Sequence, residues 1–151
     1  MSEMKIEFSE NGICFVSGKL NEYMNMAPVV HSGKNPLILN LKGVVSTNSI
    51  GVKMWIDGLQ ELREKQISIE YHECSLPILL QCNMIPSFSK NIAIQSFFID
   101  YACADCGEEK TQLLTLEQVQ QNDYPIPSCP ECGEEMEMDK EDILDFLEWT
   151  S

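Results

Sequence analysis

Hydrophobic and polar residues alternate in two short stretches near the start of the chain. The stretches are residues 4–8 and 13–20, and Glu10-Asn11-Gly12 lies between them. An Asn-Gly pair between two apolar runs is a strong signal for a β-hairpin. The sequence therefore predicts two strands joined by a turn. A short helix at 21–26 is expected to follow and to end before Pro28.

The hydrophobic pattern in the middle of the chain predicts a buried strand followed by a helix. A nearly continuous apolar run at 37–41 predicts a strand that is covered on both faces. In the segment 49–65, apolar residues recur at spacings of three and four, namely Val52, Trp55, Ile56, Leu59 and Leu62. This spacing places them on one face of a helix. Asn48 or Ser49 is expected to cap its start.

The remaining pattern of the first hundred residues continues this alternation. Residues 67–71 alternate as in a half-buried strand, 76–85 predict a helix that Pro86 ends, and 92–101 predict a further extended segment. Strands that alternate with helices predict an α/β fold, with a mixed sheet, some parallel pairs and helices packed on it.

One part of this pattern resembles a known family, the STAS domain, which is named for sulphate transporters and anti-sigma-factor antagonists. The resemblance rests on the apolar strand Leu37-Ile38-Leu39-Asn40-Leu41-Lys42-Gly43-Val44 and on Thr47-Asn48-Ser49-Ile50-Gly51, which opens the amphipathic helix. The family has Asp-Ser-Ser-Gly or Asp-Ser-Thr-Gly at this helix start. The order of strands and helices also fits, so the resemblance covers roughly residues 1–95.

The resemblance implies a non-enzymatic regulatory module of a bacterial type. Antagonists of this family bind a partner kinase or an anti-sigma factor, and phosphorylation of the Ser after the Asp breaks the complex. That Ser corresponds to Ser49 here. The sequence departs from the family at Asn48, which replaces the Asp, and at Ile50, which replaces a second hydroxyl residue. The alternative role for Ser49 is that of a helix cap.

The net charge of −14 is concentrated in the last third of the chain. Residues 1–100 carry ten acidic side chains against eight Lys and Arg, a balance of −2, whereas 101–151 carry fourteen against two, a balance of −12. Such a segment is repelled by the phosphates of nucleic acids and by an anionic membrane leaflet. We therefore expect neither as a partner. The acidic face is either solubilising or a contact surface for a basic partner protein.

The composition predicts a soluble, cytoplasmic protein. No apolar stretch approaches the ~20 residues of a membrane span, and the N-terminus lacks the pattern of a signal peptide. The seven cysteines are an odd number, and four of them form two C-x-x-C pairs. This usage is typical of a reducing compartment, where thiols are free to bind metal.

The two C-x-x-C pairs predict a metal site made of Cys103, Cys106, Cys129 and Cys132. Each pair is followed by Gly, and twenty-two residues separate the pairs. Four thiolates in tetrahedral geometry favour zinc or iron. We expect zinc in a structural role, because no coordination position is left for water. The flanks resemble a zinc ribbon, with strands at 97–101 and 110–116.

An alternative for the same ligands is an iron site that serves electron transfer. The second pair, Cys129-Pro130-Glu131-Cys132-Gly133, resembles rubredoxin, in which four such thiolates hold redox-active iron. A purified sample that is red would favour iron. The last predicted element is a helix at 139–149. The charge shift near residue 100 divides the chain into a STAS-like domain at 1–95 and an acidic zinc-ribbon module at 96–151.

No catalytic constellation is evident, so we expect a binding protein. The sequence has no Gly-rich phosphate loop, no Ser-His-Asp set and no carboxylate pair at catalytic spacing. His72 and Cys74 share a strand face but have no third ligand, so they are not expected to bind metal. Cys14 and Cys82 are expected in the core. The partner's identity and the oligomeric state stay open.

Overall fold

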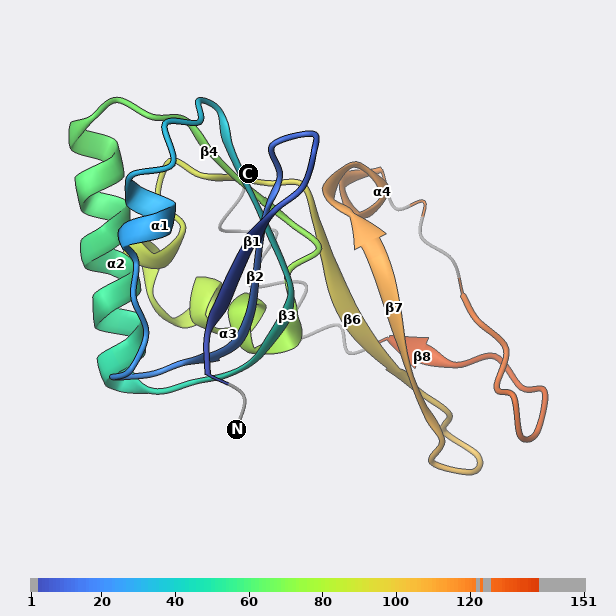
Figure 1. Cartoon of the computed structure of the whole chain (residues 1–151). Coiled ribbons are helices and arrows are strands. Elements are labelled where there is room, and N and C mark those ends of the chain that lie inside the picture. The colour runs from blue at the N-terminus through green and yellow to red at the C-terminus, as the bar shows by residue number, and fades with distance from the viewer. Residues whose placement is uncertain (1–2, 122, 124–125, 139–151) are drawn as a thin grey trace.

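The computed structural model describes residues 3–121, 123 and 126–138, and it is an α/β protein with two sheets, as the sequence predicts (Figure 1). The first sheet has five strands in the order β1-β2-β3-β4-β5. Its strands are β1 (Lys5–Phe8), β2 (Cys14–Leu20), β3 (Leu37–Thr47), β4 (Ile69–His72) and β5 (Ala93–Ile94). Its helices are α1 (Ala27–Val30), α2 (Ser49–Glu64) and α3 (Leu76–Met84), and the 3-10 turn η1 (Pro86–Phe88) follows α3.

The predicted hairpin at the start of the chain is confirmed. Strands β1 and β2 are antiparallel, with Lys5 opposite Ser17 and Phe8 opposite Cys14. Gly12 in the connecting turn has a φ of 82°, which a residue without Cβ adopts most readily. Along β2, buried and more exposed residues alternate strictly, so this strand has one face toward the core.

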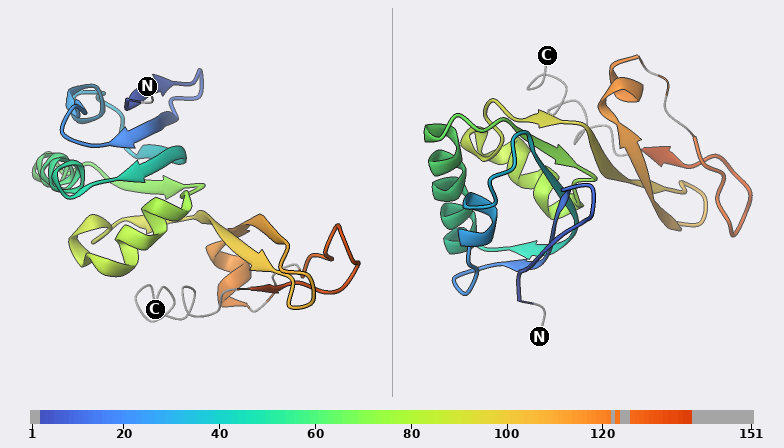
Figure 2. Two further views of the ribbon diagram at one scale, coloured as in Figure 1. Left: turned by 90° about the horizontal axis from the view of Figure 1, so that it is seen from below. Right: turned by 45° about the horizontal axis from the view of Figure 1, so that its top comes forward.

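Strands β2 to β5 form the parallel part of the sheet, and β3 lies at its centre, as its apolar sequence predicts. The ladder places Leu39 of β3 between Cys14 of β2 and Tyr71 of β4. Parallel neighbours require crossover connections, and α1, α2 and α3 supply them in turn. Helices α1 and α2 lie side by side on one face of the sheet (Figure 2).

The first helix does not lie where the sequence predicts it. Residues 21–26 form a turn and an irregular segment, and α1 begins only at Ala27. Pro28 therefore lies in the first turn of a helix instead of after its end. The physical reason is that backbone N–H groups in the first turn have no acceptor within the helix, so proline, which lacks this group, is tolerated there.

Helix α2 is capped by Asn48, whose Oδ1 accepts a hydrogen bond from the Gly51 backbone N–H at 2.8 Å. The capping role considered for Ser49 is therefore wrong, because Ser49 is already the first helical residue. Val52, Trp55, Leu59 and Leu62 are buried, as their spacing predicts. Gly51 and Gly58 are buried on the same face.

An aromatic cluster forms the centre of the core. Trp55 of α2 donates from Nε1 to the Tyr71 hydroxyl at 2.9 Å, and that hydroxyl donates to the Phe88 carbonyl at 2.6 Å. The rings of Trp55 and Phe88 stack with centroids 6.0 Å apart. Burial raises the pKa of Tyr71 well above 10.0, so its hydroxyl remains a donor. The three aromatic residues come from α2, β4 and η1 and fix these elements together.

The second sheet is antiparallel and has the order β7-β6-β8. Its elements are β6 (Ser96–Ala102), β7 (Glu109–Thr115), α4 (Leu116–Gln120) and β8 (Glu137–Met138). The extended segment predicted at 92–101 is in fact two strands, because β5 belongs to the first sheet and β6 to the second, with Gln95 between them. The strands predicted at 97–101 and 110–116 do pair. The helix predicted at 139–149 lies outside the described residues.

The base of β6 is anchored to the first sheet. The Cys74 N–H donates to the Ser96 carbonyl at 3.0 Å, and the Phe98 N–H donates to the Cys74 carbonyl at 2.9 Å. Ser96 Oγ also accepts a hydrogen bond from the Glu73 N–H at 2.8 Å. From this base the second sheet projects away from the first, as Figures 1 and 2 show. The division into domains at 1–95 and 96–151 stays a prediction.

Candidate functional site

The four cysteines of the two C-x-x-C pairs converge on one point at the end of the second sheet. Their Sγ atoms all lie within 4.8 Å of one another. Two pairs are closer, because Cys103 Sγ lies 3.4 Å from Cys132 Sγ and Cys106 Sγ lies 3.4 Å from Cys129 Sγ. A metal ~2.3 Å from each of four tetrahedral sulfurs would hold them about 3.8 Å apart. The arrangement is therefore one that could hold a metal ion.

Two hairpin tips bring these residues together. The first pair lies at the tip between β6 and β7, where Ala102 is paired with Glu109. The second pair lies at another tip, closed by a bridge between Ser128 and Glu135. Strand β8 then returns to β6 and pairs with Ala102 next to the first tip. The short strand β8 thus sets the second tip against the first.

The two tips have the same local geometry. In each, the first cysteine's N–H donates to a carbonyl five residues later, from Cys103 to Glu108 at 2.8 Å and from Cys129 to Glu134 at 2.7 Å. In each, the glycine after the pair donates to the carbonyl of the first cysteine at 2.9 Å. Both glycines have a φ of 79°. This repetition explains why each pair carries the same C-x-x-C-G sequence.

Burial and hydrogen bonding differ among the four thiols. Cys103 and Cys129 are each 3% exposed, whereas Cys106 and Cys132 are exposed. The backbone N–H of Cys106 lowers the pKa of Cys103 from 9.0 to about 7 against the opposing effect of burial. Backbone hydrogen bonding at Glu134 lowers the pKa of Cys132, but hydrogen bonding with neighbouring thiols, chiefly that of Cys103, outweighs it and raises the pKa to about 12. A cation must displace the thiol protons, so acid opposes metal binding.

The donor set fits a metal that is bound for structure. All four ligand atoms are sulfur, and four thiolates complete a tetrahedral shell without a water position. The described core of the second sheet is small and includes Ile99, Tyr101, Leu114, Val119 and Met136. A metal would link the ends of three strands that this core alone holds weakly. Four sulfur ligands suit zinc and iron alike.

The purified full chain is expected to contain one zinc ion and to be colourless. Zinc has no visible absorption, whereas iron held by four thiolates is red. The measurement is elemental analysis of protein expressed with both metals supplied in excess, together with a visible spectrum. Replacement by cobalt serves as a control, because it should produce the visible bands of a tetrahedral thiolate site. Iron at one ion per chain in the red protein would contradict the expectation.

The other residue singled out in the sequence, Ser49, lies far along the chain from the cysteines and at the start of α2. It is exposed, and so are its neighbours Asn48 and Ile50. Asn48 Nδ2 donates to Glu22 Oε2 at 2.8 Å. Hydrogen bonds from its own backbone N–H and from Asn48 lower the pKa of Glu22. A charged carboxylate therefore lies against Asn48, the residue that precedes Ser49.

Two residues of this second site were not found by sequence reasoning. Glu22 follows β2 and reaches the cap of α2 from a distant segment. Gln81 of α3 donates from Nε2 to the Thr47 hydroxyl at 3.1 Å, and so connects α3 to the end of β3. A hollow of about 280 Å³ lies between α2 and α3 here and is lined by Thr47, Asn48, Ser49, Val52, Gln81 and Ile85. Neither contact has a local signal in the sequence.

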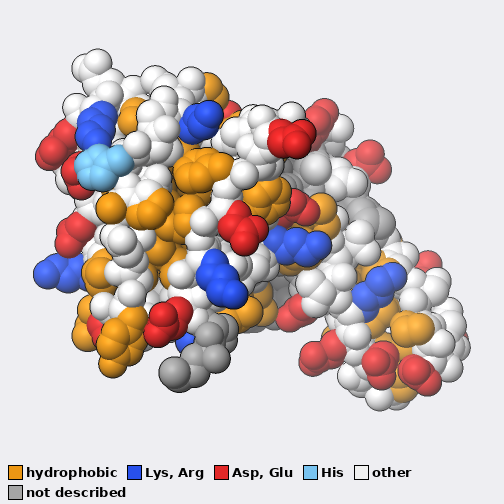
Figure 3. All heavy atoms as spheres, in the orientation of Figure 1, with side chains coloured by type: hydrophobic (Ala, Val, Ile, Leu, Met, Phe, Trp, Pro, Cys, Tyr) orange, Lys and Arg blue, Asp and Glu red, His pale blue; other side chains and the backbone are white. Residues whose placement is uncertain are grey.

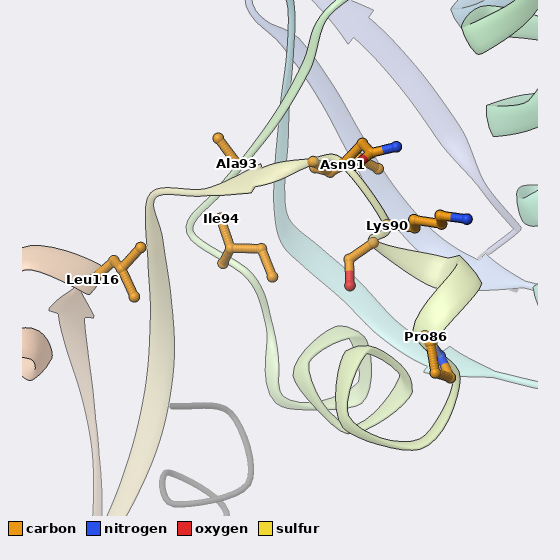
Figure 4. A pocket seen from close by; sticks show the side chains of 8 residues that line it. Pro86, Lys90, Asn91, Ala93, Ile94 and Leu116 are labelled. Atoms are coloured by element: carbon orange, nitrogen blue, oxygen red, sulfur yellow. The ribbon is translucent and has the colours of Figure 1, made fainter. Parts of the chain in front are cut away.

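The remaining candidates have ordinary structural places. His72 Nε2 lies 3.1 Å from Glu70 Oε1, and Cys74 is fully buried beside Cys82. Cys14 is also fully buried, as predicted. A hollow of 580 Å³ lies between β5 and the start of α4, lined by Lys90, Asn91, Leu116 and five others (Figure 4). Its lining contains no acid, histidine or cysteine.

Comparisons with protein-family models, with curated proteins and with solved structures find no match to this chain. The family suggested by residues 37–51 therefore stays a prediction. Across the described residues, no helix combines the length and the apolar character that crossing a membrane requires.

Proposed function

We propose that this protein is a non-enzymatic regulatory module that binds another protein through the start of α2. The observation that carries the proposal is that Ser49 is exposed in the first turn of α2, beside the exposed Ile50 and at a hollow that extends to α3. Ile50, in the first turn of α2, is 53% exposed, and Met84 at the end of α3 is 64% exposed. Leu80 of α3 is 39% exposed. We call this set, with Ser49 and the adjoining hollow, the α2–α3 surface.

The α2–α3 surface has the character of a protein contact. Gln81 joins α3 to Thr47, so Leu80 and Met84, on either side of Gln81 in α3, are held near the start of α2. Exposed large apolar side chains near a shallow hollow, which here includes Val52 and Ile85 in its lining, are typical of surfaces that bind other proteins. In open α/β sheets, binding sites also gather at the carboxyl ends of parallel strands, where β3 meets α2.

Phosphorylation of Ser49 would act as a switch on this surface. A phosphate adds a charge of about −1.5 to −2 next to the exposed Ile50. The helix start favours an anion, but the Glu22 carboxylate next to Asn48 repels it. A partner that packs on Ile50 would then bury the phosphate charge without an opposite charge to pair with it. This is the behaviour expected from the resemblance to anti-sigma-factor antagonists, whose partners are kinases and anti-sigma factors.

The acidic second sheet has a supporting role in this proposal. A zinc-bound ribbon would present a rigid, negatively charged surface that enlarges the contact or selects a basic partner. The same charge opposes contact with nucleic acids and anionic membranes. None of the seven cysteines is in a disulfide, which supports a cytoplasmic location.

Affinity capture with matched baits tests the proposal. The full chain and Ser49→Ala are expected to retain the same protein from cell extract, whereas Ser49→Asp and Ile50→Glu are expected to lose it. Leu113→Glu, on the exposed part of β7, is the control and should retain it. We expect at least a tenfold loss of affinity, since removing an apolar contact and burying a charge costs more than about 1.4 kcal/mol. Equal retention by all five baits would refute the proposal.

The second candidate function is electron transfer by an iron centre. The observation in its favour is that Cys106 and Cys132 are exposed, which would bring a redox-active metal close to the surface. A reversible redox wave together with visible absorbance in the purified chain would support it. A colourless zinc protein without such a wave would exclude it.

A further inference from the structure

Strand β1 leaves one edge of the first sheet open. It is first in the strand order, and among the described residues it pairs with β2 alone. Just beyond the strand, the Ser9 N–H donates to the Ile13 carbonyl at 2.9 Å. The backbone groups of successive residues point in alternating directions along an antiparallel ladder. The backbone N–H and C=O groups of Lys5 and Glu7 therefore point toward β2, as the Ser9 N–H does. Ile6 therefore turns its N–H and C=O outward, toward solvent.

The side chains of β1 divide into an apolar and a charged set. Ile6 and Phe8 lie opposite the core residues Val16 and Cys14, but Ile6 is only half-buried and Phe8 is 41% exposed. Figure 3 looks onto this side of the molecule and shows hydrophobic side chains gathered between charged ones. On the opposite face of the strand, Lys5 and Glu7 are exposed.

Lys5 and Glu7 have no ion-pair partner in the described part of the chain. Their spacing has a particular property under two-fold symmetry. If a second β1 lies antiparallel to the first with the axis at Ile6, each Lys5 faces a Glu7, and Ile6 faces its own copy. Each pair of Lys5 with Glu7 of the second copy is then a non-hydrogen-bonded pair of the ladder, in which opposite side chains come closest. The strand is thus complementary in charge to itself.

We propose that a second copy of this chain binds to the open edge of β1, so that the two first sheets form one continuous sheet. The outward N–H and C=O groups of Ile6 would bond to those of its copy. Phe8 would face Met4 of the second copy on the core side of the sheet, which would cover the apolar side chains that the monomer exposes. The interface is isologous, as in most two-fold dimers.

Charge also selects this register and this edge. Moving the axis by one residue, to Lys5 or to Glu7, would place like charges opposite each other, which is unfavourable. Residues 1–100 have a balance of only −2, against −12 for 101–151. Strand β1 and the second sheet lie at opposite ends of the first sheet (Figure 2), so a dimer through β1 keeps the two acidic second sheets apart.

Charge-reversal variants of the full chain test the proposal by sedimentation across a range of protein concentrations. The wild type is expected to dimerise. Lys5→Glu and Glu7→Lys should each weaken dimerisation by about tenfold or more, because both symmetric contacts become repulsive. A mixture of these two variants should form a heterodimer, since each charge again meets its opposite. Lys53→Glu, an exposed change of the same charge in α2, should dimerise as the wild type does.

Three outcomes would overturn the proposal. A wild type that stays monomeric at every concentration would refute the dimer. A dimer that Lys5→Glu and Glu7→Lys leave intact would place the interface elsewhere. Two monomeric variants that fail to associate when mixed, although circular dichroism shows both folded, would show that these charges do not face each other.

Discussion

Cys129→Ser is expected to abolish metal binding and to unfold the second sheet beyond its base, while the first sheet stays folded. The variant leaves three thiolates, and the small core around Tyr101 and Met136 does not hold the two hairpin tips together without the metal. Apparent binding free energies of structural zinc are about 10–16 kcal/mol, and in small modules this is the folding free energy itself. A chelator added to the wild type should have the same effect.

The structure predicts where this unfolding stops. Ser96 and Phe98 are hydrogen-bonded to Cys74 of the first sheet, so the base of β6 does not depend on the metal. Hydrogen exchange followed by mass spectrometry should show protection lost between about residues 99 and 138 and kept in 5–94. Cys14→Ser is the matched control, because it places a hydroxyl in the first core and should lower stability without changing zinc content. Full metal content in Cys129→Ser would contradict the assignment.

The parts of the fold that the sequence predicts correctly are those with a local cause. The Asn11-Gly12 turn, the apolar face of α2 and the C-x-x-C-G tips each depend on residues within one turn or one helix. Helix α4 has a local cause as well. Thr115 and Gln118 form a capping box, with Thr115 Oγ1 accepting from the Gln118 N–H at 3.1 Å and Gln118 Oε1 accepting from the Thr115 N–H at 2.9 Å.

The parts that the sequence does not predict depend on contacts between distant segments. The sequence of residues 92–101 is that of one extended segment. In the structure, β5 pairs with β4 whereas β6 is hydrogen-bonded to Cys74, so the chain passes from one sheet to the other at Gln95. Pro28 is compatible both with the end of a preceding helix and with the first turn of a following one. At the candidate sites, the ligand cysteines follow from their spacing, whereas the Glu22 contact with Asn48 requires the fold itself.

Gly51→Ala is expected to destabilise the first sheet by about 3 kcal/mol or more. A Cβ at this position would lie 2.0 Å from the Leu20 carbonyl oxygen and 2.5 Å from the Asn21 nitrogen. These are backbone atoms that no rotamer change can move. The Leu20 carbonyl also accepts the Asn48 N–H at 3.0 Å, so a shift of either chain disturbs the cap of α2. Denaturant unfolding followed by circular dichroism measures the loss.

Gly58→Ala separates this close approach from the general effect of alanine in a helix. Both glycines are buried on the same face of α2, and alanine favours the helix by ~1 kcal/mol at either position. At Gly58 the new Cβ would lie 2.7 Å from Met26 Cε, the end of a flexible side chain that can turn away. Its stability should therefore stay within about 1 kcal/mol of the wild type. If both variants were equally stable, α2 would not pack against the end of β2 as closely as these distances require, and the contact of Asn48 with Glu22 would be in doubt with it.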